Sequence, residues 1–202
     1  MSDVEEGIER AERRLKAAYW GLKQFQDATG EDKLIGLVNA VTAGRSVTWV
    51  LQKNLSDVDG FDEWYRNCRE VLKNDDICSH MVEVRNKIEK EGDEGVTDYS
   101  RIDTMNSEEL RRNAPPWADR IFIGDNYGGS GFIIEQPDGE DVKIYYDFPD
   151  LAFESGLFFE DLGGDDDGVY SEITDAEDDL KYYLKVIFEI VDDAKDRFGD
   201  GG

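Results

Sequence analysis

The chain has little of three residue types on which much protein chemistry depends: one histidine, two cysteines and four prolines among 202 residues. A Ser-His-Asp triad would have to pass through the single histidine, His80, and no spacing supports one. Cys68 and Cys78 do not make a disulfide framework. Together with His80 they offer three ligands where zinc needs four, and no fourth lies nearby in sequence. We therefore expect no metal site, and we expect both cysteines to be free thiols on packed helices.

Long apolar runs and cofactor motifs are also missing. No run approaches the ~18 apolar residues of a membrane span, and the acidic start, residues 1–6, is followed by no apolar signal region. The Asp-rich segment 163–174 lacks both key carboxylates of a calcium loop. The Gly-rich segment 124–129 lacks the Lys-Ser/Thr of a phosphate loop. These absences predict a cytoplasmic protein with no membrane anchor and no cofactor.

Basic residues are scarce, since 23 Lys and Arg face 48 Asp and Glu, for a net charge of −25. The imbalance is uneven: residues 1–92 hold 14 basic and 18 acidic residues, whereas residues 93–202 hold 9 and 30. Such a charge bears on solubility, salt and partners rather than on fold. The preferred interpretation is salt adaptation, because this acidic surface resembles that of haloarchaeal proteins. The alternative is an acidic half that docks a basic protein partner; non-specific nucleic-acid binding through it is disfavoured.

Apolar residues at alternating steps of three and four predict helices in the first half of the chain. The expected helices cover residues 3–27, 31–54, 61–72 and about 76–91. The apolar stripe of the third is expected to include Val71. Because their connections are short, they fit an antiparallel four-helix bundle over residues 1–92.

The second half has a different pattern. Residues 93–118 are polar and end at Pro115 and Pro116, which predicts a linker. Residues 137–140 read as a hairpin turn between strands, and a final helix is expected over about 175–197, either on the sheet or back on the bundle. Strands are expected over 120–124, 131–136 and 141–148, with 151–162 as a strand or a short helix. The predicted fold class is therefore α+β: the bundle, then a small antiparallel sheet of two to four strands and a C-terminal helix in an acidic unit, 119–202.

Three segments carry a family resemblance: Ala43–Gln52, Gly60–Tyr65 and Val84–Gly92. They resemble uncharacterised prokaryotic proteins with a HEPN-like helical bundle. The resemblance implies a helical bundle, a homodimer, and a place in defence, toxin–antitoxin or RNA-processing systems. Active members of that family cleave RNA with an Arg followed, after four to six residues, by a His.

The motif implied by this resemblance is broken here. The matching arginine is Arg85, with the polar Asn86 after it, but positions 90 to 92 are Lys90, Glu91 and Gly92. Metal-free RNA cleavage needs a group that exchanges a proton near neutrality, and histidine is the side chain suited to that. An active enzyme would have to use Lys90 or His80 instead.

Arg45 is the other candidate site residue, because it shares an otherwise apolar helix face with Thr48 and Gln52. A buried guanidinium must find acceptors. One interpretation is a polar network that locks the bundle. The other is a pocket for a ligand or partner. That pocket would be built from Arg45, Gln52, Arg85 and Asn86.

Three functions stay open on the sequence. The leading hypothesis is a non-catalytic HEPN-like binding component, dimeric through its bundle. The second is an atypical ribonuclease that uses Arg85. The third is a small-ligand or peptide-binding protein whose site, lined by Trp117, Tyr127 and Tyr146, lies between bundle and sheet. A ribonuclease needs Arg85 exposed in a groove, whereas an interaction protein predicts Arg85 paired within the bundle and an apolar face.

Overall fold

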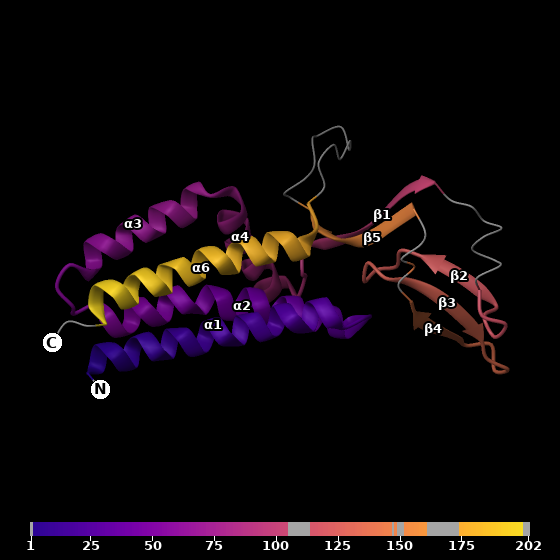
Figure 1. Cartoon of the computed structure of the whole chain (residues 1–202), viewed down its shortest axis with the longest axis horizontal. Helices are drawn as coiled ribbons and strands as arrows, with labels where there is room; N and C mark the ends of the chain where they lie inside the picture. The colour runs from indigo at the N-terminus through magenta and orange to yellow at the C-terminus, as the bar shows by residue number, and fades with distance from the viewer. Residues whose placement is uncertain (1, 105–113, 147, 149–151, 161–173, 200–202) are drawn as a thin grey trace.

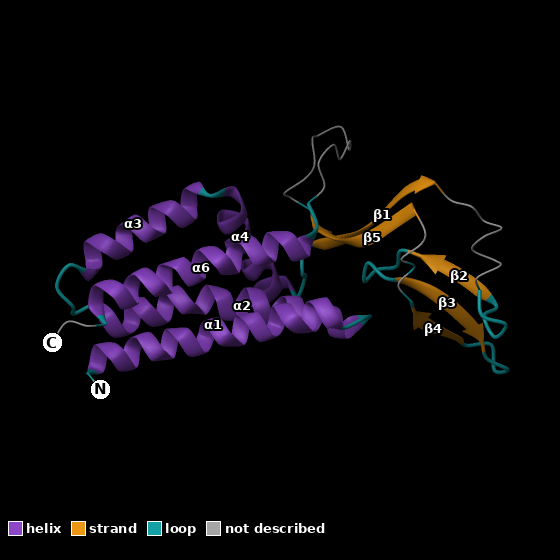
Figure 2. Cartoon of the chain, in the orientation of Figure 1, coloured by secondary structure: helices purple, strands orange, loops and turns teal. Residues whose placement is uncertain are grey.

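The computed structural model describes residues 2–104, 114–146, 148, 152–160 and 174–199. Within them the chain is α+β, with helices gathered at one end and two small antiparallel sheets at the other (Figure 1, Figure 2). The predicted fold class is confirmed. The helices are α1 (Asp3–Asp27), α2 (Glu31–Leu55), α3 (Phe61–Asn74), α4 (Asp76–Glu91) and α6 (Ala176–Phe198). The strands are β1 (Val96–Thr104), β2 (Arg120–Ile123), β3 (Ser130–Glu135), β4 (Asp141–Tyr145) and β5 (Ala152–Phe159).

Local signals start and stop these helices. Ser2 and Glu5 form a capping box at the start of α1, in which each side chain accepts a hydrogen bond from the other residue's backbone N–H. Asp75 caps α4 by accepting from the backbone N–H of Cys78 at 2.8 Å. Gly92 ends α4 with a φ of 70°, in the left-handed region that favours glycine. The boundary that the charge pattern indicates near residue 92 therefore coincides with a helix end.

The long pair α1 and α2 packs unusually closely because glycines face the partner backbone. A Cβ atom at Gly21 would collide with the backbone of Ala40, and one at Gly36 would collide with the backbone at Phe25. No larger residue fits at either position without moving a helix. The low helix propensity of Gly36 is therefore compensated by packing.

The last helix, α6, returns to the bundle, which resolves the alternative that the sequence leaves open. Leu180, Leu184 and Ile187 of α6 are buried in the same core as α1, α2 and α4. Near the C-terminal end of α6, Asp193 accepts a hydrogen bond from the indole N–H of Trp64 in α3. The bundle thus contains five helices among the described residues, rather than the four expected from residues 1–92 alone.

The sheets form two separate ladders. β1 pairs with β5 antiparallel, with Val96 opposite Phe159 at the bundle end. β2, β3 and β4 form a meander, and the predicted 137–140 turn joins its last two strands. Asp125, after β2, accepts hydrogen bonds from Lys143 and Tyr145 at 2.9 and 2.7 Å. Burial alone would raise the pKa of Asp125, but these bonds and two backbone N–H groups hold it below its ordinary value.

Two expectations about local structure were wrong. The segment 93–118, expected to be a linker, contains β1, whose partner β5 lies more than fifty residues later. Its sequence is polar because much of β1 is exposed, whereas the partner strand β5 supplies the buried side chains Leu157, Phe158 and Phe159. Val71, expected on the apolar stripe of the third helix, is 58% exposed. Residues 105–113 and the Asp-rich run 165–167 lie outside the described residues.

One described helix, α2, is long and apolar enough to cross a membrane by length and composition. In this fold 44% of its apolar window is buried inside the protein. Core helices of soluble proteins have the same composition, so α2 is explained by its place between α1, α4 and α6.

Candidate functional site

A cavity of about 630 Å³ opens between α2, α3, α4 and α6. Its wall includes apolar side chains such as Leu72, Val82 and Ile187. Its charged lining consists of four cations and two carboxylates. These charged residues are Arg45, Arg66, Arg69, Lys73, Glu70 and Glu83. In a chain with a net charge of −25, a cavity with more cations than anions stands out.

Arg45 reaches this cavity from α2. Its Nη1 donates to Thr48 Oγ1 at 2.7 Å, and its guanidinium carbon lies 4.9 Å from the centroid of the Trp49 ring. Arg45 is half-buried, and Thr48 and the Trp49 ring are the partners that its guanidinium needs there. Gln52, predicted to share this site, is exposed about two turns beyond Arg45 on α2 and does not line the cavity.

Arg85 reaches the same Trp49 ring from α4. Its guanidinium carbon lies 4.7 Å from the ring centroid, Nη2 pairs with Glu89 at 2.6 Å, and Nη1 donates to Asn86 at 3.1 Å. The Arg85 side chain is only 18% exposed. The predicted site residues Arg45, Arg85 and Asn86 thus come together around Trp49 and the cavity, with Asn86 lining the cavity itself.

The remaining candidates do not join Arg85. Lys90 is exposed in the last turn of α4. His80 is buried, and its ring packs edge-on against Phe159 of β5 with centroids 5.6 Å apart. Five residues separate His80 from Arg85, which places them about 140° apart around the helix. Neither of the two candidate proton donors therefore lies beside Arg85.

Three residues of this site were missed by the sequence analysis: Arg66, Arg69 and Lys73. They repeat at i, i+3 and i+7 on α3, which places them on one helix face. The three side chains are exposed, and no ion pair joins any of them to another described residue. Their spacing was a readable signal, but only the fold places that face at the mouth of a cavity.

Tyr183 of α6 completes the cavity from the core side. It is 2% exposed, lines the cavity, and its hydroxyl has no hydrogen-bond partner among the described residues. Gly44 of α2 makes room for the ring, since a Cβ there would lie 2.9 Å from Tyr183 Cε1. Burial raises the pKa of Tyr183, so the hydroxyl is a neutral donor near pH 7.

The thiols and possible metal ligands have structural positions. Burial is the main reason why the pKa of Cys68 is raised to about 11 and that of Cys78 is raised further. Both thiols are free and stay protonated near neutral pH. Across the part of the chain that the structure describes, no group of three His, Cys, Asp or Glu side chains could hold a metal ion.

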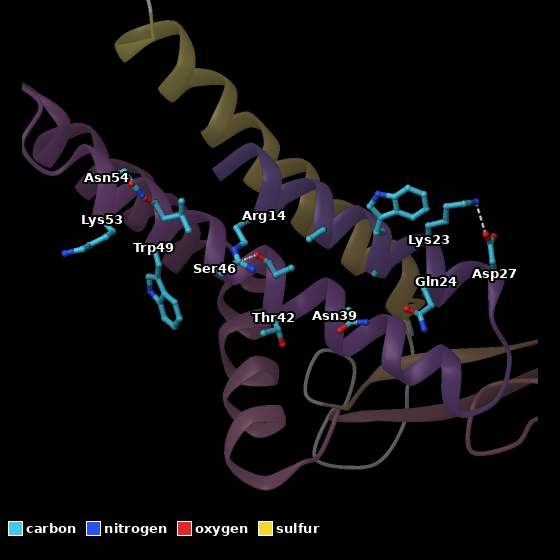
Figure 3. A pocket seen from close by; sticks show the side chains of 15 residues that line it. Arg14, Lys23, Gln24, Asp27, Asn39, Thr42, Ser46, Trp49, Lys53 and Asn54 are labelled. Carbon is cyan, nitrogen blue, oxygen red and sulfur yellow. Dashed lines mark hydrogen bonds and ion pairs between the residues drawn. The ribbon is translucent and has the colours of Figure 1, made fainter. Parts of the chain in front are cut away.

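A second hollow, about 1000 Å³, runs along the outer side of α1 and α2 (Figure 3). Two tryptophans line it, Trp20 from α1 with 62% of its surface exposed and Trp49 from α2 with 43%. Between them lie small side chains: Ala17, Thr42, Ala43 and Ser46. We call this surface the α1–α2 groove.

The charged groups of the α1–α2 groove are mostly cationic. Arg14, Lys23 and Lys53 line it, against the single carboxylate of Asp27, which pairs with Lys23 at 2.8 Å (Figure 3). The surplus acidic charge of the chain is therefore displayed elsewhere.

The aromatic residues expected between bundle and sheet belong to the three-stranded sheet. Trp117 packs edge-on against Phe132 of β3 with centroids 5.6 Å apart, and Tyr146 packs against the same ring at 5.5 Å. Tyr127 lies in the turn between β2 and β3, where its backbone N–H donates to Asp125. Trp117 and Tyr146 are thus exposed rings that cover the buried side chain of Phe132.

Comparison with known proteins gives one consistent result. The family model for bacteriophage lambda protein ea47 matches residues 7–119. Protein ea47 of Escherichia phage lambda is 38% identical over 85 residues, which cover 41% of this chain and 21% of that protein. The match thus spans about a fifth of the relative's length. No solved structure was found to match the chain.

These matches overturn the resemblances inferred from the sequence. Neither of them points to HEPN proteins, and the matched relative comes from a phage of Escherichia rather than from a haloarchaeon. The resemblances to HEPN and to haloarchaeal proteins were therefore wrong. The short segments that suggested HEPN lie on amphipathic helices, and the apolar spacing of such helices is common to many bundles.

Proposed function

This chain belongs to the family of bacteriophage lambda protein ea47, and we propose that the segment shared with that family, residues 7–119, serves as a non-catalytic self-association module. The observation that carries this proposal is the α1–α2 groove, whose lining residues, 14 to 54, all lie within the shared segment. The partner is a second copy of the chain, bound through the same face. The protein acts in the cytoplasm, as its sequence predicts.

The groove has the two complementary parts that a symmetric interface needs. In a two-fold dimer the same patch occurs on both subunits, so it must supply both a protruding and a receiving surface. Trp20 and Trp49 are large and exposed, whereas Ala17 and Ala43 leave space beside them. Tryptophans that enter small-residue hollows are typical of residues that dominate binding energy.

Charge also favours this face over others. Two copies carry a surplus of 25 negative charges each, which opposes association wherever carboxylates would meet. In the α1–α2 groove only Asp27 is acidic, and Lys23 neutralises it. Contact through this groove keeps the acidic surfaces apart. It brings together Arg14 and Lys53 of the two copies, which are exposed side chains whose mutual repulsion is screened by salt.

The environment of Arg85 supports a binding role rather than catalysis. A ribonuclease would present Arg85 in an open groove beside a proton-exchanging group. Here Arg85 is mostly buried and engaged by Glu89, Asn86 and Trp49. That arrangement is what an interaction protein requires of this residue.

The test is the oligomeric state in solution at constant high salt, measured by sedimentation equilibrium. We expect wild type to dimerise and Trp20→Lys to weaken the dimer by about 30-fold or more, the effect of losing a dominant interface residue. Trp117→Lys is the matched control, since Trp117 is 48% exposed and lies on the sheet unit. A wild-type monomer at every concentration, or a dimer that Trp20→Lys leaves intact, would refute the proposal.

The acidic half supports a second proposal, that residues 93–202 bind a basic protein partner. Its support is the excess of 30 acidic over 9 basic residues in that half. Binding of a lysine-rich peptide that vanishes as KCl is raised would bear it out. Binding of the peptide to the α1–α2 groove instead, shown by its loss in Trp20→Lys, would refute this second proposal.

A further inference from the structure

We infer that the cavity between α2, α3, α4 and α6 binds a small organic phosphate, with its phosphate at the α3 cations and its body directed toward Tyr183. This site is separate from the α1–α2 groove and does not depend on self-association. The ligand class is a phosphate monoester with a flat or apolar body, of which a nucleoside monophosphate is the simplest test compound.

The first step of the argument is the unpaired charge at the cavity mouth. Arg66, Arg69 and Lys73 lie on one face of α3 with a single carboxylate, Glu70, among them, so this face has a net positive charge. The chain has more than twice as many acidic as basic residues, yet no described carboxylate forms an ion pair with any of these three. A bound anion would supply the missing charge.

The number and type of these cations select among anions. Two guanidinium groups match the oxygen pairs of a phosphate in a forked geometry, and an ammonium group adds a point charge. A phosphate monoester carries close to two negative charges near pH 7. A carboxylate carries one and would leave the cluster undercompensated.

The second step is the unpartnered hydroxyl at the other end of the cavity. A buried polar group without a hydrogen bond is unfavourable, so nearly all such groups in proteins have a partner. Tyr183 lines this cavity with its hydroxyl unpaired, and its ring packs directly on Gly44. A ligand that accepts or donates a hydrogen bond there would satisfy it.

The third step is the lining between these two ends. Leu72, Val82 and Ile187 give apolar walls, and Tyr65 adds an aromatic one. A volume of about 630 Å³ lies within the range of small-molecule sites. A phosphate alone would use only the cationic mouth, so the walls and the hydroxyl indicate a ligand with a body.

The experiment is isothermal titration of the full-length protein at matched ionic strength with three probes: adenosine monophosphate, adenosine and inorganic phosphate. We expect the monophosphate to bind, and to bind more tightly than either inorganic phosphate or adenosine. Equal affinity for the monophosphate and inorganic phosphate would overturn the assignment of the body to the Tyr183 end. No heat with any phosphate would overturn the whole inference.

Two variants test the two ends of the cavity. Arg69→Gln should weaken binding about tenfold or more through the lost charged hydrogen bonds, whereas Lys185→Gln, an equal charge change on an exposed α6 residue away from the cavity, should not. Tyr183→Phe should weaken binding about threefold to tenfold and should leave the ligand-free protein at least as stable, because the lost hydroxyl has no partner.

The pattern across variants separates this site from a merely structural role. Reduced stability of ligand-free Tyr183→Phe would show that the hydroxyl already has a partner, and would overturn its assignment to a ligand. Unchanged affinity in Arg69→Gln would overturn the phosphate site. Trp20→Lys should keep its affinity for the monophosphate even if it no longer dimerises, so the two proposals fail independently.

Discussion

Arg45 of α2 and Arg85 of α4 approach the same aromatic ring, with guanidinium carbons 4.9 and 4.7 Å from the centroid of Trp49. Two like charges this close are tolerated because each has a further partner, Thr48 for Arg45 and Glu89 for Arg85. The ring and the two cations join α2 to α4, next to both the α1–α2 groove and the cationic cavity.

Replacing Arg85 should therefore affect stability. We expect Arg85→Ala to lower the free energy of unfolding by about 1–2 kcal/mol, the combined size of a cation–π contact and a partly exposed ion pair. Urea denaturation followed by circular dichroism measures it. Arg13→Ala, which breaks only the exposed pair with Glu9, should change stability by about 0.5 kcal/mol or less. Equal losses in the two variants, or an RNA-cleavage activity lost with Arg85, would contradict a structural role.

Asp179 should make stability depend on pH. It is 2% exposed, its Oδ2 has no hydrogen-bond partner among the described residues, and its pKa is raised to about 6 by burial and then by Asp175 and Asp178. The folded state holds the Asp179 proton more tightly than the unfolded state does. The stability that this proton contributes is therefore fully present below about pH 4 and is lost as pH rises through about 6.

Asp179→Asn cannot ionise, so it avoids the loss of stability that wild type suffers as pH rises. We expect the variant to be more stable than wild type by up to about 3 kcal/mol at about pH 8, and to differ little at about pH 4. Urea denaturation at the two pH values measures the difference. Asp196→Asn, at an exposed position of the same helix that does not contribute to the raised pKa of Asp179, serves as the control and should show no such pH-dependent gain. A gain of the same size at both pH values would point to packing rather than to ionisation.

The glycine contact between α1 and α2 should reverse the usual effect of alanine. In a helix interior Gly→Ala ordinarily stabilises by up to about 1 kcal/mol. At Gly21 the added Cβ would meet the backbone of Ala40, so we expect a loss of about 1–3 kcal/mol. Thermal unfolding of Gly21→Ala measures it. Lys16→Gly, at an exposed position outside the groove, tests propensity on the same helix, and a stabilised Gly21→Ala would show that the two helices can separate without cost.

Salt should raise stability through screening. With 48 acidic and 23 basic residues, most carboxylates have no cation to pair with, and the folded state concentrates their repulsion. We expect the urea midpoint to rise steeply as KCl increases toward molar concentration, where the screening length falls to about 3 Å. Sucrose, which stabilises by exclusion without ions, is the control. A midpoint that responds to sucrose but not to KCl would rule out charge repulsion as a major term.

The sequence predicted most elements because their signals are local. Ser2 and Glu5, Asp75 and Gly92 mark helix ends by themselves, and the 137–140 turn sets its own hairpin. β1 was missed because its pairing with β5 is long-range and its sequence has no local turn signal.

The candidate site was predicted only in part, for a similar reason. Arg45, Arg85 and Asn86 were selected by polarity on apolar faces, and the fold brings them together. Tyr183 looked like an ordinary core residue, since nothing in its own helix shows that its hydroxyl faces a cavity wall made by α2 and α3. The spacing of Arg66, Arg69 and Lys73 places them on one face of α3, but the sequence does not show that this face lies at the mouth of a cavity.

The antiparallel ladder of β1 and β5 has a consequence for dissecting the protein. Val96 follows α4 and Phe159 precedes α6, and the two residues are paired across the ladder, one strand spacing apart. The whole β unit is thus an insertion whose entry and exit are adjacent. A short turn spliced between these two positions would leave the five helices with their own connections, and such a minimal version would keep the helical part of the shared segment, residues 7–91, without the β unit.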